Sequence, residues 1–220
     1  MKIQVLFLSV LLSSLVVLLV ACLRAEPTPS RNFKIQDLLI DLSVMPTDWY
    51  VSNPLHPFPE NRGQQESIEI QFDAKSPTLY GTQHLVFRYT TKSAATWEYQ
   101  DQAQGEFGVA LLVKPWHAPP ELPYTSPIAD QFRFECADVK FYDVQTNCVA
   151  MAQYDEYISI ISTHMDPSLM TFADMGRILR AIDAKMAQYL GKPIPNTILQ
   201  DATTTAFDTR NSLANAMTLH

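Results

Sequence analysis

Residues 131–163, QFRFECADVKFYDVQTNCVAMAQYDEYISIIST, contain three successive segments with the residue pattern of β-strands. In the first, about Gln131–Ala137, apolar and polar residues alternate, which is typical of a strand with one buried face. The second and third run at about Thr146–Gln153 and Glu156–Thr163, and the isoleucines of the third suit burial on both faces. The stretch therefore predicts neighbouring strands of a mainly antiparallel sheet.

The two cysteines of this stretch, Cys136 and Cys148, follow the same alternation phase in the first two segments. If the chain turns near Tyr142-Asp143, their thiols face each other across adjacent strands. Such a pair in an oxidising compartment usually forms a disulfide, which would stabilise the fold by about 3 kcal/mol. A redox-active pair is the alternative, but it usually takes a Cys-x-x-Cys motif or a cationic setting. The sequence favours a structural disulfide.

The upstream sequence contains further strand and helix patterns. Alternation predicts strands at Ser67–Phe72 and about Thr82–Thr91, and an apolar run predicts another at Phe107–Val113. Apolar residues at helical spacing predict a helix over Phe33–Val44. The segment Lys92–Gln104 is ambiguous, although its alanine and glutamine content favours a helix.

The clearest helix pattern follows the three strands. Thr171 is a suitable N-cap with Asp174 near the positive end of the helix dipole, and Gly191 is a suitable C-cap. The apolar stripe consists of Met175, Ile178, Leu179, Ile182, Met186, Tyr189 and Leu190. We expect Asp183, like Asp174, to lie on a largely solvated face of this helix.

This order of elements predicts an α+β domain, a mainly antiparallel sheet packed by helices that include a long C-terminal amphipathic helix. It resembles the PsbP/Mog1-like domains and the secreted sensor domains of some bacterial kinases. The resemblance rests on element order and carries over no functional residue. One extracytoplasmic domain over residues 33–193 is expected, followed by a polar C-terminal tail over residues 194–220.

The amino terminus carries a positive residue, Lys2, an uncharged run over Ile3–Val20, and then Leu19-Val20-Ala21-Cys22, which resembles the lipobox of bacterial lipoproteins. The resemblance implies a lipoprotein signal peptide or membrane anchor over residues 1–22, lipidation of Cys22, and a tether over residues 23–32. An uncleaved transmembrane helix and a secretory signal cut near Ala25 are the alternatives. All three place the following chain outside the cytoplasm, anchored at a periplasmic or cell-surface side in the first two cases.

Composition and motif content restrict the classes of function. The formal net charge of −7 repels the phosphate backbone, so we expect no nucleic-acid partner. We find no Gly-x-Ser-x-Gly, no phosphate-binding glycine loop and no His-Glu-x-x-His motif, so we expect no catalytic residue, no metal and no cofactor. The carboxylate pair Asp155-Glu156 is expected at a turn, and a lone histidine such as His164 favours a structural role.

Two proline-rich segments, Trp49–Pro59 and Pro115–Tyr124, carry aromatic residues that suit binding to a partner. The candidate partner-binding residues are Trp116, His117, Tyr124, Trp49 and Tyr50. The alternative is that both segments are stiff loops covering the sheet edges, with their tryptophans in the core.

Three hypotheses for the function follow. The first is a non-catalytic accessory lipoprotein docked on the extracytoplasmic face of a membrane protein complex, as are lipoprotein subunits of electron-transfer complexes such as alternative complex III. The second is a small-molecule binding or sensing domain, with a pocket lined by groups such as Trp97, Tyr99 and Trp116. The third is an enzyme whose site is assembled from scattered residues. The anchor and the aromatic segments favour the first.

Overall fold

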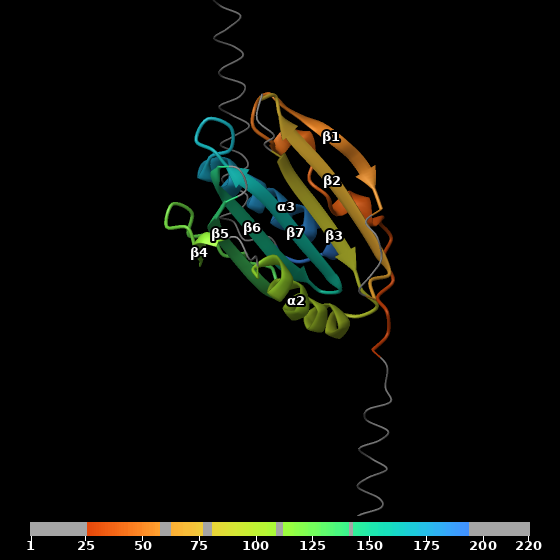
Figure 1. Ribbon diagram of the computed structural model, residues 1–220. Helices are drawn as coiled ribbons and strands as arrows, with labels where there is room; N and C mark the ends of the chain where they lie inside the picture. The colour runs from red at the N-terminus through yellow and green to blue at the C-terminus, as the bar shows by residue number, and fades with distance from the viewer. Residues whose placement is uncertain (1–25, 58–62, 77–80, 109–111, 141–142, 194–220) are drawn as a thin grey trace, which may run out of the picture.

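The computed structural model describes residues 26–57, 63–76, 81–108, 112–140 and 143–193 of the 220-residue chain. Within these residues seven strands form one sheet in the order β1-β2-β3-β7-β6-β5-β4, and every neighbouring pair is antiparallel (Figure 1). The strands are β1 (Trp49–His56), β2 (Glu66–Ala74), β3 (Gly81–Arg88), β4 (Leu112–His117), β5 (Gln131–Lys140), β6 (Val144–Tyr154) and β7 (Tyr157–Met165). The predicted α+β class with a mainly antiparallel sheet is confirmed.

Helices cover both faces of the sheet. Helix α2 (Lys92–Glu106) packs on one face, here called the α2 face, and α3 (Phe172–Leu190) packs on the other, the α3 face (Figure 1). Side chains alternate between the faces along each strand, so Ile158 and Ile160 of β7 join the α2 core while Ile161 joins the α3 core. No helix of the described part of the chain is long and apolar enough to cross a membrane.

Helix α3 lies over the residues where the apolar spacing predicts a helix. Thr171 accepts a hydrogen bond from the backbone N–H of Asp174, and the Asp174 carboxylate accepts one from the N–H of Thr171 at 3.0 Å. Gly191 ends the helix in the left-handed region, with φ of 67°. These reciprocal bonds form a capping box, which satisfies backbone donors that a helix start leaves unpaired.

The hairpin of β5 and β6 has the register that the cysteine phase predicts. Cys136 is the direct partner of Cys148, and a disulfide joins the two. Because both residues point to the α3 face, the disulfide lies in the core on that side. Strand β5 ends at Lys140 and β6 begins at Val144, which brackets the predicted turn.

Two predicted elements are wrong. The helix expected over Phe33–Val44 is a pair of short 3-10 turns, η1 (Ile35–Leu38) and η2 (Leu42–Val44). Three consecutive residues from Leu38 to Ile40 are buried, and the backbone N–H of Ile40 donates to His84 at 3.2 Å, which a continuous helix would not permit. The strand expected at Phe107–Val113 is wrong at its start, because Phe107 is the C-cap of α2, and β4 comprises Leu112–His117.

The amino-terminal part of the described chain lies against the domain instead of forming a free spacer. The guanidinium of Arg31 donates to both carboxylate oxygens of Glu156, at 2.7 and 2.6 Å. The carbonyl of Pro29 accepts a bond from Arg88 at 3.0 Å. The expected tether over residues 23–32 is thus bound to the sheet over its later part. Cys22 with the signal peptide or anchor, and the tail over residues 194–220, lie outside the described residues.

Candidate ligand-binding cleft

A cleft of about 320 Å³ lies on the α3 face and is lined by residues of strands β4 to β7 and of the first turn of α3. It is bounded on one side by the connection from β7 to α3, which an Asp166–Met170 bridge closes into a tight loop. On the other side lies the segment after β4, through Pro119 and Glu121. The volume is at the lower end of the range for small-molecule sites.

The floor of the cleft is apolar. It is formed by Cys136, Met165, Met170 and Phe172. Cys136 and Met165 point there because they belong to the α3-facing set of β5 and β7, while Phe172 is the first residue of α3. A floor of thioether, disulfide and aromatic groups favours the apolar body of a ligand.

The rim of the cleft is polar and carries both charges. Its side chains are Lys114, His117, Glu121, Asp138, Thr146 and Asp166. Asp138 accepts a hydrogen bond from the Thr146 hydroxyl at 2.8 Å. His117 Nδ1 lies 3.1 Å from the carbonyl oxygen of Pro115, a contact that orients the imidazole ring. An apolar floor below such a rim suits a small molecule with an apolar body and one or two polar groups.

A buried carboxylate, Asp183, holds one wall of the cleft in place. Its side chain is 1 % exposed and accepts hydrogen bonds from the hydroxyls of Tyr124, Ser126 and Tyr154. Tyr124 and Ser126 belong to the same segment as Glu121, so the network ties that segment to α3. Burial raises the pKa of Asp183.

The expected solvated position of Asp183 is therefore wrong. The sequence carries a signal for its burial, because Asp183 stands four residues after Leu179 and four before Ala187, both of which are buried. The Asp155-Glu156 pair is only partly as expected. Asp155 adopts the turn conformation with φ of 52°, whereas Glu156 is buried against Arg31.

The partner-binding candidates do not form one surface. Trp49 is buried and donates its indole N–H to the carbonyl of Leu169 at 3.0 Å, whereas Tyr50 is exposed on edge strand β1. Trp116 packs edge-on against Phe107 at the other edge of the sheet. His117 lines the cleft, and Tyr124 bonds to Asp183.

The three aromatic residues expected to line a pocket do not come together in one: Tyr99 lines a shallow pocket between α2 and β5, without Trp97 or Trp116. Trp97 is 68 % exposed, while Tyr99 is buried and donates its hydroxyl to the carbonyl of Met151 at 3.1 Å. Neither lines the cleft. Helix α2 thus uses Tyr99 for packing and leaves Trp97 in solvent.

Among the described histidines, two are buried to different degrees. His84 lies in the α3 core, where burial lowers its pKa to about 3, and it contacts the Ser159 hydroxyl at 2.9 Å. His164 is half-buried on the other side of the sheet, and burial lowers its pKa. Among the described residues, no three His, Cys, Asp or Glu side chains gather as metal ligands would.

Comparison with known proteins shows the fold. No protein-family model and no curated protein sequence matches the chain. Among solved structures, the chain is similar to the extracellular domain of PknH from Mycobacterium tuberculosis, with a TM-score of 0.50 and 11 % identity. The match covers 76 % of this chain and 100 % of that one. The two share an architecture over the whole of that domain.

Proposed function

We propose that the chain is an extracytoplasmic domain that binds or senses a small molecule in the cleft on the α3 face. The observation that carries this proposal is the cleft itself, with an apolar floor beside the disulfide and a rim of both charges. The similarity to an extracellular domain and a disulfide, which oxidising compartments favour, both support the extracytoplasmic location.

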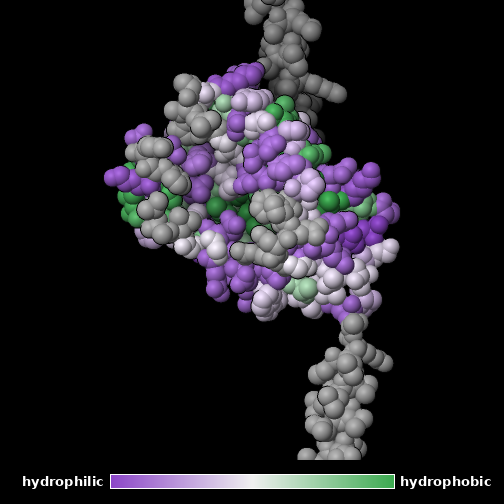
Figure 2. All heavy atoms as spheres, turned by 45° about the vertical axis from the view of Figure 1, so that its right-hand side comes forward, coloured by the Kyte–Doolittle hydropathy of each residue, from purple (hydrophilic) through white to green (hydrophobic). Residues whose placement is uncertain are grey.

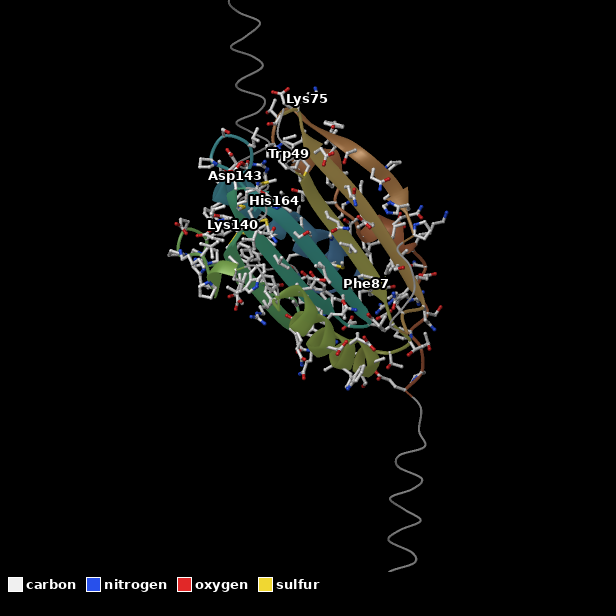
Figure 3. All side chains as sticks on the ribbon, in the orientation of Figure 1. Trp49, Lys75, Phe87, Lys140, Asp143 and His164 are labelled. Atoms are coloured by element: carbon white, nitrogen blue, oxygen red, sulfur yellow. A yellow bond between two sulfur atoms is a disulfide. The ribbon has the colours of Figure 1, made fainter. Side chains whose placement is uncertain are left out.

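The position of the amino-terminal segment is consistent with this role. Residues 26–31 bind the end of the sheet that holds Arg88 and Glu156, whereas the cleft lies at the opposite end of the strands. Figure 3 shows this separation, with Asp143 and Trp49 toward the cleft end and Phe87 toward α2. Strand β6 spans its 11 residues between the two ends, or roughly 35 Å. If Cys22 anchors the chain, the cleft therefore opens far from the membrane surface.

Docking on a membrane complex stays a hypothesis with less support. The face of the protein that Figure 2 shows is mainly hydrophilic, with small, separate apolar patches, which is typical of a solvated face. The exposed large apolar residues Tyr50 and Val51 lie on β1, and Leu112 and Val113 lie at the opposite edge, on β4. The lack of catalytic activity likewise stays an expectation.

A matched pair of variants tests the proposal. Small molecules that co-purify with the full chain in mild detergent are identified by mass spectrometry, and their affinities are measured by equilibrium dialysis. Thr146→Phe places a ring in the cleft, whereas Val144→Phe adds the same ring at an exposed position outside it. We expect Thr146→Phe alone to weaken binding at least tenfold, or about 1.4 kcal/mol. Equal affinity for both variants, or no retained molecule, would refute the proposal.

A further inference from the structure

A second, polar pocket of about 210 Å³ lies on the α2 face, on the part of the sheet where the lining comes from strands β2, β3, β6 and β7. Its side chains form two rows across the strands. The first row is Asp73, Gly81, His164 and Asn147, and the second is Gln71, Gln83 and Ser162. The rows that follow carry apolar residues such as Leu85 and Ile160, which α2 covers. The polar rows thus end where the packed core begins.

Gly81 lets the Asp73 carboxylate lie close to the backbone of β3. A Cβ atom on this residue would lie 2.9 Å from that carboxylate, so a side chain here would displace it. Register places His164 as the next residue of the same row, beyond Gly81. The Asp73 carboxylate and the His164 imidazole therefore lie on either side of Gly81, which has no side chain.

Two glutamines are held in fixed orientations by a buried carboxylate. Glu69 is 2 % exposed, and its side chain accepts hydrogen bonds from the amide nitrogens of both Gln71 and Gln83. His56 Nε2 lies 3.3 Å from the second oxygen of Glu69. Because their amide nitrogens bond to Glu69, the glutamines keep their carbonyl oxygens available as acceptors. Ordering of these side chains before binding lowers its entropic cost.

The chemistry of the lining selects a class of ligand. Within the described residues it contains amides, hydroxyls, one imidazole and one carboxylate, and it has no Lys, Arg, Phe, Tyr or Trp. A site without a cation does not suit an anion, and a site without apolar side chains does not suit a hydrophobic body. Neighbouring acceptors and donors suit adjacent hydroxyl groups, which both donate and accept. We propose that this pocket binds an uncharged, polyhydroxylated small molecule, independently of the cleft on the α3 face.

The test uses the full chain in detergent micelles with 15N-labelled histidine, because each region has its own reporter. His164 lines the polar pocket, His117 lines the cleft, and His84 is buried in the α3 core. Three probes share one six-membered carbon ring and differ in their polar groups: myo-inositol, cyclohexylamine and cyclohexanecarboxylate. We expect myo-inositol to shift the His164 signals and leave those of His84 unchanged, with the two charged probes binding at least about tenfold more weakly.

Two variants and one control locate the binding. Gln83→Leu removes one oriented amide, and Gly81→Ala keeps every polar group but displaces the Asp73 carboxylate. Each should weaken myo-inositol binding about tenfold, the effect of one or two lost hydrogen bonds. Gln188→Leu makes the same exchange at an exposed site on α3 and should change nothing. Unchanged His84 signals verify that each variant is folded.

The other outcomes overturn the proposal. If His164 responds to no probe, or if both pocket variants keep full affinity, the pocket is not a site. A preference for cyclohexylamine would mean that Asp73 selects a cation and would refute the polyol class. A response of His117 to myo-inositol without one of His164 would move binding to the cleft, which refutes this inference and supports the proposed function.

Discussion

Asp183 provides a quantitative test of how the cleft wall is held. Its carboxylate pairs with three hydroxyls, of which those of Ser126 and Tyr154 are buried. In Asp183→Ala each of these two buried hydroxyls loses the acceptor to which it donates, at about 1–3 kcal/mol each. Part of this loss is offset, because the folded state no longer has to desolvate a charge. We expect the free energy of unfolding to fall by about 3 kcal/mol in Asp183→Ala and by about 1 kcal/mol in Asp183→Asn, which keeps one acceptor.

Urea unfolding of the full chain in mild detergent, followed by the fluorescence of its three tryptophans, measures these differences. Asp143→Ala, an exposed aspartate at the β5–β6 turn, is the control and should stay within about 0.5 kcal/mol of the wild type. If Asp183→Ala were equally neutral, the network would not hold the wall and our reasoning about the cleft would fail.

The pH dependence of the same variants gives an independent check. Burial raises the pKa of Asp183 in the folded state, so the folded chain binds this proton more readily than the unfolded chain. The contribution of Asp183 to stability therefore increases as pH falls through its folded pKa and decreases as pH rises. Asparagine does not titrate, so the stability difference between the wild type and Asp183→Asn should become larger in acid. A difference that shrinks in acid would show that the folded pKa is lowered.

Three further predictions concern other parts of the fold. Replacing Cys136 and Cys148 together by serine should reduce the free energy of unfolding by about 3 kcal/mol. Wild type with its disulfide reduced is the control and should show the same loss. Burial lowers the pKa of His84 to about 3 in the folded chain, so as pH falls the unfolded chain binds this proton first. The free energy of unfolding should therefore fall as pH drops below about 6.5. In a pH series of urea melts, His84→Gln should remove this part of the pH dependence. Arg31→Gln leaves the buried Glu156 carboxylate without its partner and should lower the free energy of unfolding by about 3–5 kcal/mol in the same assay. A loss below about 1 kcal/mol would contradict the docking of the amino-terminal segment on the sheet.

The sequence predicted well those elements whose structure follows from a local residue pattern. Alternation along Gln131–Ala137 implies one buried face, and the shared phase of the cysteines then implies the β5–β6 register. The ends of α3 at Thr171 and Gly191 were predictable because helix caps are local and depend on few residues.

The elements that it missed depend on contacts between distant parts of the chain. Ile40 leaves the helical path to bond to His84, which lies 44 residues away. Arg31 docks on Glu156 across 125 residues, and no local pattern marks either partner. Strand β4 contains Pro115, which suggests a loop, yet an edge strand tolerates proline because its outer side has no neighbour to bond.

The candidate site was hidden for the same reason. The cleft is lined by residues from strands β4 to β7, from the β7–α3 connection and from the start of α3, and only the folded chain brings these residues together. The aromatic residues that stand out in the sequence, such as Trp49, are used for packing instead. Two residues had a readable signal. His117, a candidate from the proline-rich segment, lines the cleft, and Asp183 stands on the apolar stripe of the helix.

The central claim is that the cleft on the α3 face holds a small molecule. The most direct test is the 15N-histidine spectrum of the full chain before and after its co-purified small molecules are removed by exhaustive dialysis. We expect the His117 signals to shift on removal and to return when the molecules are added back, while those of His84 stay in place. Identical His117 signals in the two preparations would contradict the claim.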